Sequence, residues 1–223
     1  MKHVLPALPF DAAALEPHID ARTMALHHGG HHGTYVAQLN AAIGRYPELE
    51  GRSAAWLLLN PNKLPEEARA AVRSAAGGHV NHSLFWRAMS AKGGGVPSGR
   101  LADAIARNFG SFETFRTRFE QAAAEVLGSG WVWLARAQQN GGLLRLYTTP
   151  GHGNPMLQGH FPILVNDLWE HAYYLKHENR RHEYLAGWWA VVNWGEAARR
   201  FERSDHAAVN RWVAEGDLLL EDA

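Results

Sequence analysis

The chain has 223 residues, 46% of them hydrophobic, which is enough for one large domain or two small ones with a real core. Its 22 basic and 22 acidic residues cancel, so no overall positive field points to nucleic acid or an anionic membrane. The absence of cysteine excludes a disulfide framework and agrees with a reducing compartment. Since the first residues lack the apolar run of a secretory signal and no segment reaches transmembrane length, we expect a cytoplasmic protein.

The N-terminal part is predicted to be a helical hairpin. A first helix is expected over Leu15 to Ala42, with Asp20 as a cap for the stretch beyond it and glycines that thin the helix where histidines crowd. Residues 44–65 carry the punctuation of a loop or a broken helix. Proline and acids at 65–67 then open a second helix that runs to about Met89. The two long helices would pack antiparallel.

The segment 91–100, A-K-G-G-G-V-P-S-G-R, is the strongest boundary in the chain. It divides the sequence into an N-terminal domain, 1–90, and a C-terminal domain, 91–223. The C-terminal domain is predicted to be mixed α and β, and the expected elements follow in chain order. They are helices over 101–109 and 112–127, strands over 131–137, 143–149 and 161–169, and helical structure from 172 to about 215, with a short amphipathic helix near Val209, Trp212 and Val213.

The most informative residues are Asp167 and His171, in the run N-D-L-W-E-H-A-Y-Y. A carboxylate in so apolar a segment needs a partner if it is buried. Two distant segments also carry histidines, H-H-G-G-H-H at 27–32 and N-H-S-L-F-W at 81–86. Together the three could surround one ion with nitrogen and oxygen ligands, a shell that suits manganese, iron or zinc.

Each histidine segment also has a plainer interpretation. On a regular helix, His27 would share a face with His31, and His28 with His32, which is a common arrangement for a divalent metal. The same spacing is equally typical of a polar helix face. His82, set among apolar neighbours, is by itself more typical of a hydrogen-bonded core residue than of a ligand.

Taken together, the motifs resemble those of the iron/manganese superoxide dismutases. The resemblance covers about residues 3 to 200 and depends on A-L-E-P-H-I-D, H-H-G-G-H-H-G-T-Y-V, N-H-S-L-F-W and D-L-W-E-H-A-Y-Y-L-K, with G-S-G-W-V-W-L and N-R-R. It implies an α+β fold, with an N-terminal antiparallel helical hairpin and a C-terminal α/β domain around a three-stranded antiparallel sheet. It also implies an antioxidant oxidoreductase that converts superoxide to oxygen and hydrogen peroxide.

The resemblance further implies a site of one iron or manganese ion per subunit between the two domains. The family's ligands fall on four residues, with a solvent molecule as the fifth ligand: His27, His82, Asp167 and His171. Tyr35 and His31 match residues that control solvent and substrate beside the metal. The aromatic wall of the family corresponds to Trp86, Trp131, Trp133 and Trp169.

Other matching positions concern the subunit contact and the approach of substrate. Glu170 resembles a residue that reaches His171 of a second subunit, and Tyr173 one that reaches His31, so a homodimer or tetramer is expected. Arg180, with Lys176 nearby, could provide a local positive field that steers superoxide.

One position departs from the family pattern. Manganese-type members carry a glutamine where this chain has His152, and iron-type members commonly carry one at the position of Gly78. Neither glutamine is present, and the histidine favours iron or the use of either metal. Two alternatives stay open at this point: a mononuclear metal-dependent hydrolase built on the same shell, and a metal-binding homologue without activity.

Overall fold

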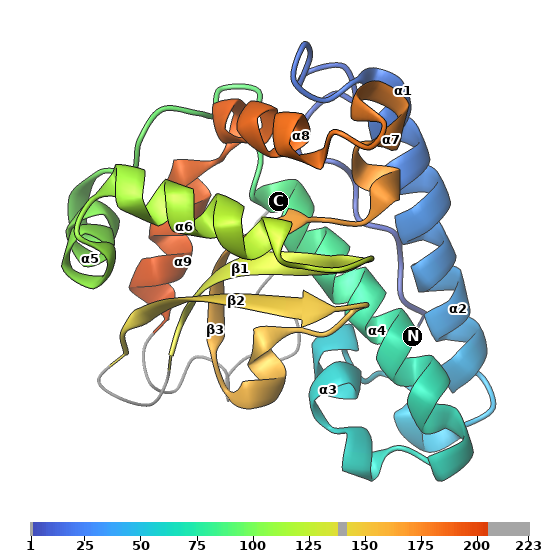
Figure 1. Ribbon diagram of the computed structural model, residues 1–223. Coiled ribbons are helices and arrows are strands. Elements are labelled where there is room, and N and C mark those ends of the chain that lie inside the picture. The colour runs from blue at the N-terminus through green and yellow to red at the C-terminus, as the bar shows by residue number, and fades with distance from the viewer. Residues whose placement is uncertain (1, 138–141, 205–223) are drawn as a thin grey trace.

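A computed structural model describes residues 2–137 and 142–204. It contains a helical N-terminal part and a C-terminal part with a three-stranded sheet, and the long helix α4 lies between them (Figure 1). This confirms the predicted α+β fold. The helices of the N-terminal part are α1 Ala21–Ala25, the π-helical stretch η1 Leu26–His32, α2 Gly33–Ile43, α3 Ala54–Leu59 and α4 Glu66–Arg87.

The first long helix is continuous from Ala21 to Ile43, so its predicted start at Leu15 is wrong. Residues 12–18 form turns instead. The helix begins after Asp20, whose carboxylate accepts a hydrogen bond of 2.8 Å from the backbone N–H of Thr23 and so caps the first turn. Asp20 therefore caps this helix as the sequence predicted.

Helix α2 packs along α4, as expected for the hairpin. The connection between them holds the short helix α3 and two 3-10 turns, Pro47–Leu49 and Pro61–Lys63, in agreement with the predicted broken segment. Helix α4 begins with Glu66 and Glu67 in its first turn, where carboxylates stabilise the helix dipole. Its C-terminal half is buried almost without interruption and faces the sheet domain.

The C-terminal part contains α5 Gly99–Phe109, α6 Phe112–Ala124, β1 Gly130–Arg136, β2 Leu144–Pro150, β3 Phe161–Asp167, α7 Tyr174–His177, α8 Arg181–Trp188 and α9 Trp194–Arg203. The strand order is β2-β1-β3, with both pairs antiparallel. Helix α6 ends three residues before its predicted end. The region predicted as helical after residue 172 is divided into α7, α8, the 3-10 turn Trp189–Val191 and α9. The amphipathic helix expected near Val209 lies outside the described residues.

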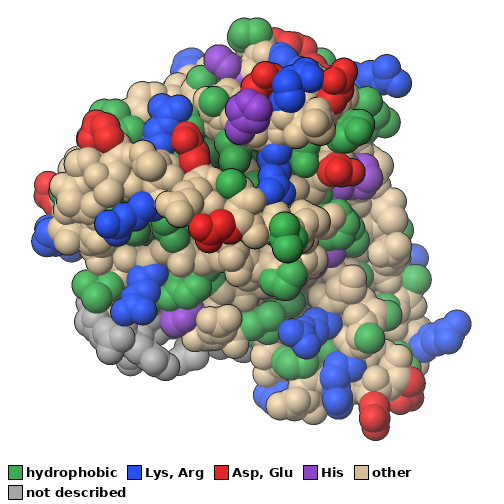
Figure 2. Space-filling view, viewed as in Figure 1, with side chains coloured by type: hydrophobic (Ala, Val, Ile, Leu, Met, Phe, Trp, Pro, Cys, Tyr) green, Lys and Arg blue, Asp and Glu red, His purple; other side chains and the backbone are tan. Residues whose placement is uncertain are grey.

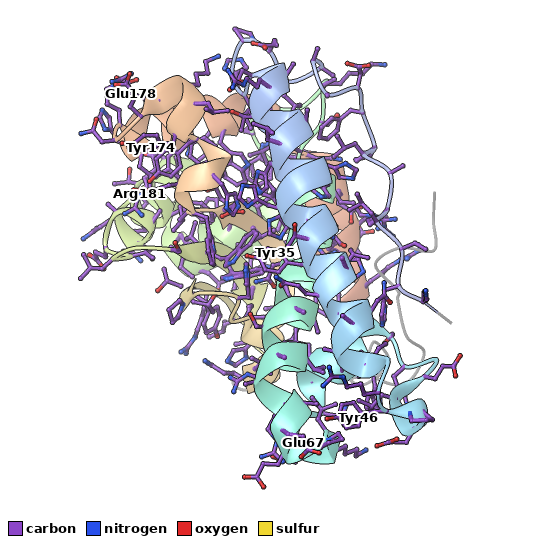
Figure 3. All side chains as sticks on the ribbon, turned by 90° about the vertical axis from the view of Figure 1, so that its right-hand side faces the viewer. Tyr35, Tyr46, Glu67, Tyr174, Glu178 and Arg181 are labelled. Atoms are coloured by element: carbon purple, nitrogen blue, oxygen red, sulfur yellow. The ribbon has the colours of Figure 1, made fainter. Side chains whose placement is uncertain are left out.

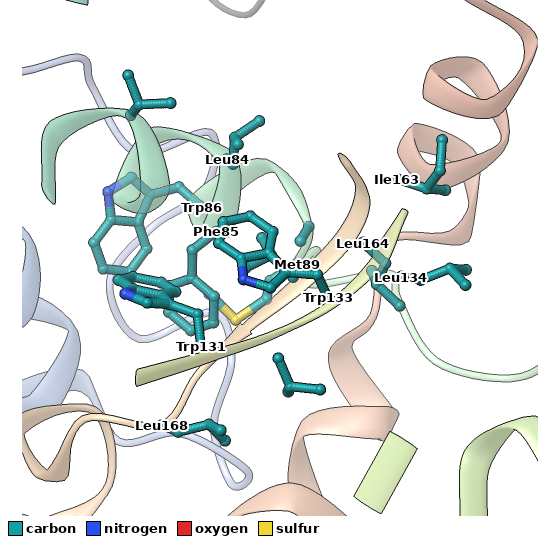
Figure 4. Packing of buried hydrophobic residues seen from close by; sticks show 14 of the residues in the cluster. Leu84, Phe85, Trp86, Met89, Trp131, Trp133, Leu134, Ile163, Leu164 and Leu168 are labelled. Atoms are coloured by element: carbon teal, nitrogen blue, oxygen red, sulfur yellow. The ribbon is translucent and has the colours of Figure 1, made fainter. Parts of the chain in front are cut away.

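The core joins the two parts of the molecule. Phe85 and Trp86 from α4, and Met89 just after it, pack with Trp131 and Trp133 from β1 (Figure 4). Positive and negative side chains are interspersed over the face drawn in Figure 2, in keeping with the balanced charge. Within 2–137 and 142–204, the helices are all too short or too polar to cross a membrane.

Candidate metal centre

Four segments bring one ligand atom each to a common point. His27 comes from η1, His82 from α4, Asp167 from the last position of β3, and His171 from the 3-10 turn Glu170–Ala172 that follows. Their ligand atoms all lie within 4.8 Å of one another. The Oδ2 atom of Asp167 is 3.1 Å from Nε2 of His27, 3.3 Å from Nε2 of His171 and 3.7 Å from Nε2 of His82. The structure thus unites the four residues from both domains around a single carboxylate oxygen.

Asp167 is fully buried, yet its environment keeps it ionised. Its Oδ1 atom accepts a hydrogen bond of 2.8 Å from the backbone N–H of Trp169, which leaves Oδ2 directed at the histidines. Burial alone would raise the pKa of this carboxyl, but His171 and His27 outweigh burial and hold the pKa well below its usual range. A negative charge is therefore fixed at the centre of the cluster.

The protonation states of His82 and His27 are those of metal-binding imidazoles. Nδ1 of His82 lies 2.6 Å from the carbonyl oxygen of Gly78, and because a carbonyl only accepts, Nδ1 must carry the hydrogen. Its Nε2 atom is then a bare lone pair, buried and without a hydrogen-bond partner among the described residues. Burial lowers the pKa of His27 to about 4, although the bond to Asp167 opposes the shift. Neutral imidazoles beside a carboxylate form the donor set that iron, manganese and zinc accept.

A π-helical turn decides which histidines of the 27–32 segment face inward. Residues Leu26–His32 follow the wider π-helical winding, which often marks a functional site. His27 and His32, five positions apart, are both buried, whereas His31 is exposed and His28 is half-buried. The expected sharing of faces by residues four apart is therefore replaced by a five-residue spacing. A π-helix has more residues per turn than an α-helix, so its inward face recurs later.

Tyr35 and His31 lie beside the four-residue cluster. The Tyr35 ring is 5.5 Å from the His82 ring and contacts His152 edge-on at 4.3 Å, while His31 stacks on His171 at 4.0 Å. In Figure 3, Tyr35 lies between α2 and the rest of the molecule. Burial, reinforced by Asp167, raises the pKa of Tyr35, so its phenol remains a hydrogen-bond donor at neutral pH.

Three of the four predicted tryptophans contact histidines of the four-residue cluster. Trp86 lies edge-on to His27 at 4.7 Å, Trp131 lies edge-on to His82 at 5.1 Å, and Trp169 stacks over His171 at 5.5 Å. Trp133 lies behind Trp131, further from the four-residue cluster. It packs against Trp131 and donates its Nε1 hydrogen bond to Thr149, so its contact with the site is indirect.

His152 follows β2, and its ring lies between Tyr35 and Trp169, near His82. Its ring stacks on Trp169 at 4.6 Å with an interplanar angle of 9°, and both ring nitrogens are buried with no hydrogen-bond partner among the described residues. The indole N–H of Trp131, 6.1 Å away between ring centroids, is also unpartnered within that part of the chain. Burial lowers the pKa of His152 to about 4, so the imidazole is neutral.

Gly78 is the other position at which the family places a glutamine. A Cβ atom at Gly78 would lie 2.5 Å from the ring of Tyr35. No side chain fits there unless Tyr35 moves. Of these two positions, His152 is therefore the one that places a side chain near the cluster, with its ring 6.0 Å from that of His82.

Sequence reasoning missed two features of this region. The turn that carries His152 is held to α4 by side-chain amides: Asn154 donates to Asn81 at 2.8 Å, and Asn81 donates to the carbonyl of Gly153 at 3.1 Å. The only sequence signal for this link was the place of Asn81 directly before His82. The second feature is a buried pair of histidines, His32 and His79, behind the ligands.

Glu170 and Tyr173 lie on either side of His171 in the sequence but differ in burial. Glu170 is exposed, and Tyr173 is buried against Tyr184. Arg180 forms ion pairs with Glu178 at 2.8 Å and Glu183 at 3.1 Å, so much of its charge is balanced locally. The Lys176 ammonium contacts the carbonyl of Pro17 and lies 3.9 Å from Glu16. Both cations therefore have acidic neighbours within their own subunit.

Comparisons with known proteins agree with this geometry. Residues 2–90 match the model of the alpha-hairpin domain of iron/manganese superoxide dismutases, and residues 97–200 match the model of their C-terminal domain. The chain is 50% identical over 198 residues to superoxide dismutase [Mn] 3 of Leptolyngbya boryana, covering 89% of this chain and 82% of that protein. It is 47% identical over 202 residues to superoxide dismutase [Mn] of Listeria monocytogenes, covering 91% and 98% of the two chains.

A third relative is superoxide dismutase [Mn] of Thermus thermophilus, 46% identical over 200 residues, which span 90% of this chain and 97% of that protein. Both domain models match in the expected order, and the similarity extends over nearly the whole described chain. The chain therefore belongs to the iron/manganese superoxide dismutase family.

Proposed function

We propose that His27, His82, Asp167 and His171 hold the one iron or manganese ion at which this superoxide dismutase works. The observation that carries the assignment is the convergence of four ligand atoms within 4.8 Å, one of them the Nε2 lone pair of His82, which has no partner among the described residues. Two superoxide ions and two protons give one oxygen and one hydrogen peroxide. When bound, the ion supplies the one-electron redox chemistry that these side chains lack.

The remaining roles belong to the surrounding side chains. The phenol of Tyr35 stays protonated and lies near both His82 and His152, so it can donate a hydrogen bond or relay a proton to a small anion beside the ligands. His31, exposed and stacked on His171, connects this region to solvent. Trp86, Trp131 and Trp169 enclose the ligands and limit access to very small substrates, which favours redox chemistry on superoxide over hydrolysis.

We further propose that the site accepts either iron or manganese and that His152 sets the balance. Support comes from its nitrogens beside the ligands, unpartnered within the described chain, and from the exclusion of a side chain at Gly78. The names of the relatives refer to manganese. A neutral imidazole can donate one hydrogen bond, as an amide does, and hydrogen bonds to the groups around an ion tune its potential.

A homodimer is proposed as the working assembly, with each site completed by Glu170 of the neighbouring subunit. Tyr174 and Leu175 are 49% and 53% exposed, and they adjoin Glu170 and Tyr173. Figure 3 shows Tyr174 near Glu178 and Arg181 at the α7 end of the molecule. Sedimentation velocity should give a dimer that Glu170→Ala weakens; a fully active monomer would refute the proposal.

The cytoplasm is the proposed compartment, in line with the lack of cysteine.

Metal analysis together with a superoxide assay tests the assignment. The purified protein should contain iron, manganese or both, and removal followed by reconstitution with either metal should abolish and restore activity. A protein that retains zinc and has no superoxide activity in any form would overturn the assignment.

A further inference from the structure

A second group of buried histidines lies behind the ligands. The indole N–H of Trp86 donates to Nδ1 of His32 at 2.9 Å, and Nε2 of His32 lies 2.7 Å from Nδ1 of His79. His32 and His79 are 0% and 3% exposed. Neither residue belongs to the cluster of four ligands.

The direction of both hydrogen bonds follows from donor chemistry. An indole only donates, so Nδ1 of His32 must present a lone pair. A protonated imidazole would have hydrogens on both nitrogens and could not accept, so His32 is neutral with its hydrogen on Nε2. That hydrogen is donated to His79, whose Nδ1 accepts it. Trp86, His32 and His79 therefore form one directed chain, which we call the back chain.

Two rings of the back chain pack against two of the proposed ligands. His32 stacks on His82 with ring centroids 5.3 Å apart and an angle of 18°, and Trp86 lies edge-on to His27 at 4.7 Å. Among the described residues, the ring of His82 is fixed by a hydrogen bond at one nitrogen only, the Nδ1 bond to Gly78. The orientation of the His82 ring about that bond therefore depends on the rings packed against it.

The far end of the back chain is covered by the N-terminal segment. His79 contacts the His3 ring edge-on at 6.0 Å. The side-chain amide of Asn40 holds the backbone of His3: its Oδ1 accepts from the His3 N–H at 2.8 Å, and its Nδ2 donates to the His3 carbonyl at 2.9 Å. Nε2 of His28 lies 2.8 Å from the carbonyl of Pro6. The His79 end of the back chain is thus covered by the N-terminal segment.

We propose that His79 is a positioning residue for the metal centre: by accepting the hydrogen of His32, it holds His32 against His82 and Trp86 against His27. The inference rests on the proposed ligand set, although His79 itself would not touch the metal. If the acceptor at His79 is lost, the buried N–H of His32 has no partner, and the ring has reason to turn away from Trp86 and His82.

Two similar polar substitutions separate this role from simple packing. In His79→Asn, the side-chain oxygen can take the place of Nδ1 and accept from His32. In His79→Gln, the longer side chain carries its polar group nearer the place of Nε2. Val72→Ala, a buried truncation on the same helix, is the control for a general loss of stability.

The measurements are the rate of manganese loss to a chelator and the visible ligand-field spectrum of the manganese-loaded protein. We expect His79→Gln to lose metal about tenfold faster than wild type and to have an altered spectrum. Tenfold is the lower end of the change in metal affinity seen when a residue that supports a metal ligand is mutated. His79→Asn should match wild type in both, and Val72→Ala should leave the spectrum unchanged. Thermal unfolding of each variant confirms that it is folded.

Equal rates and spectra for the Asn and Gln variants would overturn the inference, and so would a Val72→Ala protein that changes as much as the Gln variant. A wild-type protein that binds neither iron nor manganese would refute the proposed ligand set instead, so the two failures are distinguishable.

Discussion

The molecule contains two groups of buried histidines that differ in how their lone pairs are used. In the four-residue cluster, His82 keeps an Nε2 without a partner in the described chain, and three imidazoles surround the carboxylate of Asp167. In the back chain, His32 and His79 use their facing nitrogens on each other, and His32 also accepts from Trp86. His27, His82 and Asp167 are as deeply buried as His32 and His79, and His171 is partly exposed. A carboxylate and an uncommitted lone pair, rather than burial, distinguish a ligand cluster from a supporting one.

The largest effect should come from removing that carboxylate. Asp167→Asn takes away the anionic member of the four proposed ligands. Loss of a residue that hydrogen-bonds to a metal ligand already lowers metal affinity about 10 to 100-fold, so loss of a ligand itself should lower it further. Metal content and superoxide activity should both fall to background. The matched control, Asp103→Asn on the exposed side of α5, should keep both. Full metal content in the Asp167→Asn variant would break the distinction between the groups.

Acid should destabilise the metal-free protein partly through the back chain. Burial lowers the pKa of His79 from 6.5 to about 4. Between these values the unfolded chain binds a proton that the folded chain does not, so stability is full above pH 6.5 and falls as pH decreases. His79 alone should cost roughly 2 kcal/mol between pH 7 and pH 5.

Urea unfolding of the metal-free protein at the two pH values measures this loss. His79→Asn cannot titrate in this range, so its stability should fall by roughly 2 kcal/mol less than that of wild type. An unchanged pH dependence in this variant would mean that His79 titrates normally in the folded protein.

The fit of Tyr35 against α4 can be tested through two glycines. Gly78→Ala places a Cβ atom 2.5 Å from the Tyr35 ring, and overpacking of this kind costs about 1–3 kcal/mol. We expect a lower free energy of unfolding and lower activity. Gly30→Ala, with nothing within 4 Å of its added Cβ, should leave both nearly unchanged. Equal effects at the two sites, compared by urea unfolding, would contradict the close contact.

The smallest effect is expected at His152. His152→Gln retains a hydrogen-bond donor next to the ligands but changes its position, so the ratio of activity between the iron and manganese forms should shift. The measurement is activity per bound metal after reconstitution with each ion. If wild type and variant give the same ratio, His152 is not the tuning residue.

Much of the fold was predictable because its signals are local. Proline and acids at the start of α4 and the alternation of glycine-bearing turns with apolar runs predicted the hairpin and the strands. The start at Leu15 was wrong because the turns of residues 12–18 precede the Asp20 cap. The π-helical turn could not be foreseen, because the spacing of histidines fits an α-helix equally well.

The site was less accessible to sequence reasoning. Nothing in the spacing selects His27 over its neighbouring histidines, and the assignment came from the family resemblance. The structure adds the physical reason for it, because the π-helical turn directs His27 toward Asp167. The back chain left no signal, since His32 and His79 are 47 positions apart and meet only through packing.

An anomalous difference map from crystals of the manganese-reconstituted protein, recorded at the manganese edge, would locate the metal ion directly. We expect one peak per subunit, within bonding distance of His27, His82, Asp167 and His171, and none at the back chain. A peak beside His32 and His79, or no peak among the four proposed ligands, would contradict it.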